Sequence, residues 1–191
     1  MSRKFKAAVI GVSAGGIKTL NIILEGLPRD YPIPIIIVMH RHAESDSALE
    51  KHFDDLLKLS VHQAGDKDPI KNGTVYFAPP NYHLMIEENH TFSLTIDSPV
   101  HYARPSIDIL FETAAEFYGG ELLGIILTGA NSDGALGIKA VKHQGGFTIV
   151  QNPDSAEYPD MPNAAINTIK PDLILSPQEI GDYLGKIPKI R

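Results

Sequence analysis

The stretch that most constrains this fold is an apolar run that passes through a glycine-rich turn into a helix-like segment, residues 8–17, Ala-Val-Ile-Gly-Val-Ser-Ala-Gly-Gly-Ile. The run predicts a buried strand, and apolar residues at helical spacing predict an amphipathic helix over 16–27. Glycine permits a tight turn between them. Ser13 stands in the middle, so residues 11–15 fit the Gly-x-Ser-x-Gly pattern that exposes a serine hydroxyl. These five residues alone are also compatible with a structural turn or a phosphate-binding loop.

The same alternation of apolar runs and helical segments continues along the chain. Strands are predicted at 5–10, 33–39, 122–128, 147–151 and 173–175. The isoleucine-rich run at 33–39 is typical of a parallel strand that is buried on both faces. The chain is therefore predicted to form a single α/β domain over residues 1–191. Its expected core is a doubly wound, mostly parallel sheet with helices on both faces.

The middle third of the chain has a different pattern. Short alternating segments at 75–78, 83–86 and 92–96 are separated by turn signals, after a short strand candidate at 61–63. This pattern predicts an antiparallel β excursion attached to the parallel core.

Helix boundaries are marked by capping signals. Capping boxes at 47–50 and 176–179 each predict the start of a helix. A further helix is predicted from Ile107 to the glycine pair 119–120, and Pro162 suits the first turn of a short helix.

Composition excludes several classes of protein. The 191 residues carry a net charge of −6 with no long basic run, which argues against nucleic acid or an anionic membrane as the partner. The chain has no cysteine, which excludes disulfides and thiolate chemistry. No apolar stretch approaches the roughly 20 residues that span a bilayer, and the run at 7–12 is too short for a usual secretory signal. We expect a cytoplasmic protein without membrane insertion.

Three predicted strand ends carry residues suited to acyl transfer. Ser13 follows the first strand, His40 follows the isoleucine-rich strand, and Asp133 lies in a second glycine-rich turn at 129–134. Ligands of open α/β sheets bind at the carboxyl ends of the strands. These positions therefore supply a nucleophile, a base and a carboxylate that can orient the base. The order Ser, His, Asp differs from the Ser, Asp, His order of the usual α/β-hydrolases.

The chain resembles the catalytic domain of the bacterial chemotaxis protein-glutamate methylesterases, the CheB family. The similar motifs occur in family order along almost the whole chain, at residues 10–16, 38–40, 76–83, 104–111, 127–137 and 151–166. The resemblance assigns Ser13 as nucleophile, His40 as general base and Asp133 as the carboxylate that holds the imidazole. It implies hydrolysis of glutamate γ-methyl esters on the cytoplasmic segment of methylated chemoreceptors, and deamidation of glutamine at the same sites. It implies no cofactor and no metal.

Several positions depart from the family pattern. Ala14 stands where the family usually has threonine, Met39 where glutamine is common, and Ala130 where methionine is common. We expect Ala14, Gly15, Ala130 and Asn131 to form the substrate and oxyanion environment, because backbone N–H groups can stabilise an oxyanion whatever the side chain.

Many family members carry an N-terminal receiver domain, whereas this chain starts at the catalytic domain. The start Met-Ser-Arg favours a free-standing esterase over a fragment. We expect a separate receiver or regulatory protein to control it.

Alternative interpretations remain at this point. His40 and His42 could form a metal pair, although no third ligand has convincing spacing, and His42 is better explained as a rim residue. Asp108 and Asp160 compete with Asp133, and Asp108 is expected in the first turn of a helix. Arg104 could attract an acidic receptor segment, but a salt bridge or a solvated position explains it equally well. The remaining histidines receive no role: His62, His83, His90, His101 and His143.

Alternatives for the function also remain. One is an esterase of this fold with a different ester substrate. Another is a catalytically silent binding module. The third is a nucleotide-binding α/β protein that uses residues 11–16 as a phosphate cradle, although the spacing is not Gly-x-Gly-x-x-Gly.

Overall fold

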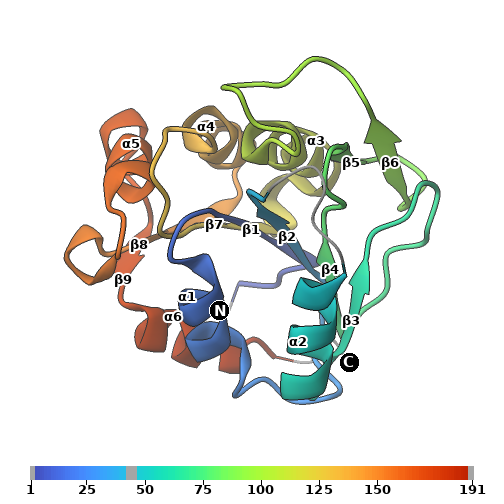
Figure 1. Ribbon diagram of the computed structural model, residues 1–191. Coiled ribbons are helices and arrows are strands. Elements are labelled where there is room, and N and C mark those ends of the chain that lie inside the picture. The colour runs from blue at the N-terminus through green and yellow to red at the C-terminus, as the bar shows by residue number, and fades with distance from the viewer. Residues whose placement is uncertain (1–2, 42–46, 189–191) are drawn as a thin grey trace.

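The computed structural model describes residues 3–41 and 47–188 and is built around one parallel sheet (Figure 1). Its strands pair parallel throughout in the order β3-β4-β2-β1-β7-β8-β9. In that order they are β3 (Ser60–Gln63), β4 (Thr74–Phe77), β2 (Ile35–Met39), β1 (Ala7–Val12), β7 (Leu122–Ile126), β8 (Phe147–Gln151) and β9 (Leu173–Leu175). The predicted α/β fold with a parallel core is confirmed.

Helices cover both faces of this sheet, as predicted (Figure 1). One layer contains α1 (Gly16–Leu24), α2 (Ala48–Leu56) and α6 (Pro177–Gly185), and the other contains α3 (Ile107–Tyr118), α4 (Ala135–His143) and α5 (Asp160–Thr168). Short 3₁₀ turns follow α3 and β8, at Gly119–Glu121 and Pro153–Ser155. Within the described residues, no helix combines the length and apolar character needed to cross a bilayer.

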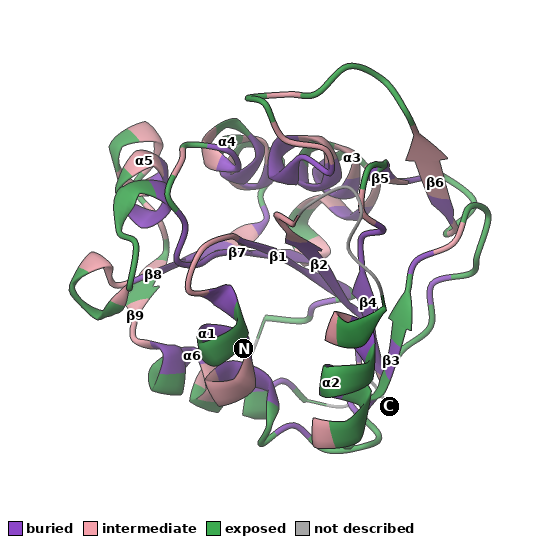
Figure 2. Ribbon diagram, in the orientation of Figure 1, coloured by how far each residue is buried: buried purple, intermediate pink, exposed green. Residues whose placement is uncertain are grey.

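The central strands are buried on both faces (Figure 2). In β1 the side chains alternate between two hydrophobic cores. Ile10 packs in the core that includes α1 and α6, whereas Val9 packs in the core that includes α3 and α4. This two-sided burial explains why the strand sequences are almost continuously apolar.

The antiparallel excursion is smaller than predicted. In the described part of the chain it consists of β5 (His83–Ile86) and β6 (Phe92–Thr95), which pair with each other. The assignment of 75–78 to this excursion is wrong, because β4 pairs parallel with β2 and β3 inside the main sheet. The alternation of apolar and polar residues was misleading here because Tyr76 is buried. Its hydroxyl accepts a hydrogen bond from Lys71 N and donates one to Pro69 O.

Of the two predicted capping boxes, one forms. Ser176 and Glu179 exchange both bonds of the box at the start of α6. The box predicted at 47–50 is wrong, because Ser47 makes no side-chain capping bond. Glu50 instead forms a buried, bidentate ion pair with Arg41. Pro162 lies in the first turn of α5, as expected.

The N-terminus of α3 lies very close to the carboxyl ends of β1 and β7. The Ile107 side chain fills space beside Gly11 and Gly134, and a Cβ on either glycine would overlap it. Gly134 has a φ of 95°, which glycine tolerates at no steric cost. These contacts fix where the first N–H groups of α3 point.

Candidate active site

The three neighbouring strands β2, β1 and β7 end at the same edge of the sheet, and each leads into a predicted site residue. His40 follows β2, Ser13 follows β1, and Asp133 lies in the turn between β7 and α4. The chain extends the sheet from β1 in both directions, so this edge is a topological switch point. Such points are where open α/β sheets bind their ligands.

Asp133 is completely buried and accepts four hydrogen bonds. Its Oδ1 accepts from Ser106 Oγ at 2.9 Å and from Asp108 N at 3.1 Å. Its Oδ2 accepts from Ile107 N and His40 Nε2, both at 2.7 Å. Burial alone would raise the pKa of Asp133, but the hydrogen bonds from His40 and the α3 amides outweigh it and hold the pKa below its usual range. The carboxylate therefore remains ionised at the N-terminus of α3, where the helix dipole favours negative charge.

His40 is oriented from both sides of its ring. Because Asp133 carries no proton, Nε2 of neutral His40 must hold the ring proton and donate it to Oδ2. Nδ1 is then the basic nitrogen, and Asn131 Nδ2 lies 3.2 Å from it. The His40 backbone N–H donates to Val12 O at 3.1 Å, which ties this histidine to the end of β1.

The Ser13 turn is fixed through its backbone by Thr128. Ser13 N donates to Thr128 O at 3.0 Å, and Thr128 Oγ1 donates to Ala14 O at 3.0 Å. Gly15 adopts a φ of 76°, and a Cβ there would lie 2.9 Å from Glu157 Cβ. The serine backbone is thus held while no hydrogen bond from a described residue restrains its hydroxyl.

The predicted oxyanion environment is partly available for binding. Within residues 3–41 and 47–188, no acceptor pairs with the backbone N–H groups of Ala14, Gly15 and Ala130. The N–H groups of Ser13 and Gly129 are already used, by Thr128 O and Tyr158 O. The candidate oxyanion donors are therefore on the turns that follow β1 and β7.

Two hollows meet at Ser13 and His40. The larger is a cleft of about 620 Å³, whose lining includes Arg41, His101 and Arg104. The smaller has a volume of about 290 Å³, and its lining includes Glu157. A substrate chain can therefore pass the serine on both sides. The larger cleft is lined by two arginines, of which Arg41 is already paired with Glu50.

Other residues singled out in the sequence have structural roles. Asp108 lies in the first turn of α3 as expected, and its Oδ1 accepts from Gly137 N at 2.6 Å. Burial raises the pKa of Asp108, and the nearby negative charge of Asp133 adds to this effect. Its Oδ2 has no hydrogen-bond partner within the described structure. Arg104 forms no salt bridge with a described residue: it donates to Asn81 Oδ1 and to the carbonyls of Ile96 and Asp97.

The proposed metal pair is not described, because His42 lies outside the described residues. Among residues 3–41 and 47–188, no three His, Asp or Glu side chains are grouped so that they could hold a metal ion.

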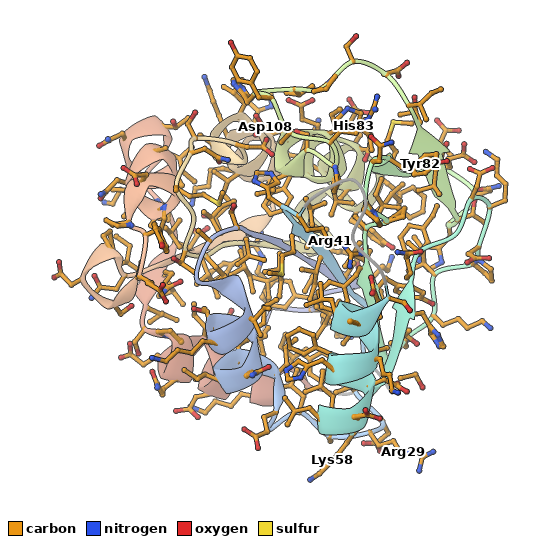
Figure 3. All side chains as sticks on the ribbon, in the orientation of Figure 1. Arg29, Arg41, Lys58, Tyr82, His83 and Asp108 are labelled. Carbon is orange, nitrogen blue, oxygen red and sulfur yellow. The ribbon has the colours of Figure 1, made fainter. Side chains whose placement is uncertain are left out.

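Sequence reasoning missed two residues that support Asp133. Ser106 caps no amide of its own helix and instead donates its hydroxyl to Asp133. His83 is buried beside it: Nδ1 accepts from Ser106 N at 3.2 Å, and Nε2 lies 3.2 Å from Ser98 O. Figure 3 shows His83 and Asp108 in the same half of the molecule, far from Arg29 and Lys58. Ser106 and His83 lie in segments that resemble the family, 104–111 and 76–83, but neither pattern indicates a bond to Asp133.

Comparisons with known proteins identify the family of this chain. Residues 8–184 match the family described as CheB methylesterase. A protein of Leptospira interrogans is 49% identical over 183 residues, which cover 96% of this chain and 95% of that protein. It carries the provisional name protein-glutamate methylesterase/protein-glutamine glutaminase.

A Clostridium acetobutylicum protein with the same name is 32% identical over 97% of this chain, which spans about half of that longer protein (54%). The crystal structure of the Thermotoga maritima CheB methylesterase catalytic domain superposes with a TM-score of 0.92. It is 31% identical, and the match covers 97% of this chain and 100% of that one. The chain therefore belongs to the CheB methylesterase family, whose members are carboxylic ester hydrolases.

Proposed function

We propose that this protein hydrolyses glutamate γ-methyl esters on the cytoplasmic segment of a chemoreceptor through Ser13, His40 and Asp133. The observation that carries the proposal is the 2.7 Å bond between His40 Nε2 and the buried, ionised Asp133, at the strand end beside Ser13. A carboxylate in this position holds the imidazole in one tautomer and stabilises the imidazolium that forms during acyl transfer. The reaction takes place in the cytoplasm, where the substrate segment lies.

The proposed reaction has two halves. Ser13 Oγ attacks the ester carbonyl while His40 Nδ1 takes the hydroxyl proton, and the oxyanion is bound by N–H groups of the two turns. The imidazolium then protonates the departing methoxide, so methanol leaves and an acyl-serine remains. Water adds to this acyl group with His40 again as base, which restores Ser13 and releases the glutamate carboxylate.

The charges around the site suit an acidic peptide. Arg104 lines the larger cleft and bonds there to uncharged oxygen atoms, so a receptor segment rich in glutamate would offer it complementary charge. The names of the Leptospira and Clostridium relatives include both a methylesterase and a glutaminase activity. We extend the second activity to this chain because the same acyl-serine forms when the leaving group is ammonia.

Control by a separate receiver or regulatory protein is part of the proposal. The cleft is open at the surface, so a partner that covers His101 and Arg104 would block the acidic substrate. Ala14 and Ala130 leave the serine turn and the aspartate turn with small side chains, which favours backbone N–H groups as the oxyanion donors.

Release of methanol from methylated receptor is the direct test. Ser13→Ala should lower the rate by about a thousandfold or more, and His40→Ala should have a similar effect, because members of a triad act as a unit. Ser132→Ala is the matched control: this serine is exposed on the turn that carries Asp133, and its hydroxyl has no role in the proposed site. It should retain the wild-type rate.

The outcomes separate mechanism from substrate. Normal turnover by Ser13→Ala would exclude the proposed nucleophile. Hydrolysis of small esters without methanol release from receptor would retain the triad and exclude the receptor as the substrate.

A further inference from the structure

The side-chain amide of Asn131 is hydrogen-bonded to His40 Nδ1, the nitrogen that acts as the base in the proposed mechanism. Asn131 Oδ1 accepts from Asp133 N at 3.0 Å, within the turn that both residues share. This bond directs the amide oxygen back into the turn and the NH₂ group toward His40. The NH₂ nitrogen lies 3.2 Å from His40 Nδ1.

Only one assignment of protons satisfies all three side chains. Asp133 is an ionised acceptor, so His40 Nε2 donates to it and the lone pair of the neutral ring is on Nδ1. The Asn131 NH₂ group can only donate, and it points at that lone pair. A ring nitrogen has one in-plane lone pair, so it accepts one hydrogen bond of good geometry at a time. The hydroxyl of Ser13 forms no hydrogen bond with His40 in this arrangement.

We propose that Asn131 blocks the base in the resting enzyme, competes with Ser13 for His40 Nδ1, and must move away before Ser13 is acylated. This inference rests on the triad proposed above. The cost of freeing the nitrogen is that of one neutral hydrogen bond, which corresponds to a rate reduced by roughly two- to tenfold. Asn131 is half-buried at the rim of the larger cleft, so an incoming substrate can displace its amide.

The decisive variant is Asn131→Ser. A serine hydroxyl is able to accept from Asp133 N and so retain the turn, but it is too short to reach His40. With the full-length protein, we expect acylation of Ser13 by p-nitrophenyl acetate to become about two- to tenfold faster. Labelling by a fluorophosphonate probe should accelerate by the same factor. Asn131→Ala is the second variant and should change both rates in the same direction.

A matched control comes from a second turn of the same type. Asn152 Oδ1 accepts from Asp154 N at 3.1 Å, with no contact to His40. Asn152→Ser should therefore leave both rates unchanged. In addition, ¹⁵N NMR of the resting protein should show the Nδ1 resonance of His40 moving downfield in Asn131→Ser and not in Asn152→Ser. A purely structural role of Asn131 would not produce that shift.

The outcomes distinguish a failure of the Asn131 inference from a failure of the proposed triad. Equal or slower acylation in both Asn131 variants would overturn the inference, because Asn131 would then be neutral or would support the reaction. An unchanged Nδ1 resonance would overturn it as well. If Ser13→Ala is still labelled at the wild-type rate, the proposed triad itself fails, whatever the Asn131 variants do.

Discussion

Ile107 links the packing of the core to the geometry of the site, and a double-mutant cycle with Gly11 measures that link. A methyl group on Gly11 would overlap Ile107 Cγ2 and lie 3.1 Å from Ile126 Cδ1. Carbon atoms in good contact are about 3.5–4.0 Å apart. Gly11→Ala should therefore destabilise the protein by about 1–3 kcal/mol through overpacking.

The partner variant has the opposite defect. Ile107 is completely buried, so Ile107→Ala should cost about 2–5 kcal/mol by leaving a cavity. In the double variant the new methyl group at position 11 occupies part of that cavity. The combined cost should be smaller than the sum of the two by about 1–3 kcal/mol. Urea unfolding followed by circular dichroism measures all four proteins.

The same variants test whether this packing positions the carboxylate. Ile107 N donates to Asp133 Oδ2, so a shift of α3 away from β1 disturbs the His40–Asp133 pair. Gly124→Ala is the control: its Cβ would lie 2.9 Å from Ile138 Cδ1, under α4 instead of α3. At comparable loss of stability, Gly11→Ala should lose more esterase activity than Gly124→Ala. Strictly additive costs, or equal losses of activity in the two glycine variants, would refute the reasoning.

Three further predictions concern buried charges. Because the native pKa of Asp133 is lowered, its carboxylate stabilises the fold above the unfolded pKa of about 3.9, and this stabilisation is lost as the pH falls through the native pKa. Below pH 4, the midpoint of urea unfolding should therefore fall more steeply with pH in the wild type than in Asp133→Asn. The pKa of Asp108 is raised, so its negative charge destabilises the fold at neutral pH. At pH 7, Asp108→Asn should therefore unfold at an equal or higher urea concentration than the wild type. A decrease of about 1 kcal/mol or more in the free energy of unfolding would contradict this. Glu50→Gln leaves Arg41 buried without its counter-charge and should lower the free energy of unfolding, measured by thermal unfolding, by about 3–5 kcal/mol. The double variant Arg41→Met with Glu50→Leu should recover most of that loss.

The sequence was sufficient to predict the parallel core because its strands are buried on both faces. Residues 33–39 and 122–128 read as apolar runs for that reason, and the polar residues that follow them had to lie at a strand end. The position of 75–78 was not predictable in this way. Its Tyr76 resembles a half-exposed strand residue until the buried hydroxyl partners are known.

The role of Gly11 shows a second limit. Its place in the Gly-x-Ser-x-Gly pattern suggested that it lets the chain turn, but only Gly15 has a positive φ in that stretch. Gly11 lies within β1 and is required because Ile107, nearly a hundred residues later, packs against it. The motif correctly located the turn, but the requirement for glycine at position 11 arises from tertiary packing, which the local sequence does not show.

The three residues of the proposed triad differ in how firmly hydrogen bonds hold them, and this difference matches the role that each has in the proposed reaction. Asp133 accepts four hydrogen bonds, from Ser106, from the first two amides of α3 and from His40, so the charge that stabilises an imidazolium needs no reorganisation. His40 is held by that carboxylate on one nitrogen and by an exchangeable amide on the other. Among the described residues, hydrogen bonds hold Ser13 through its backbone alone, which leaves its hydroxyl able to turn toward Nδ1 when the amide departs. The electrostatic part of the site is therefore preorganised, whereas the nucleophile and the access to its base are the parts that a bound substrate can set in place.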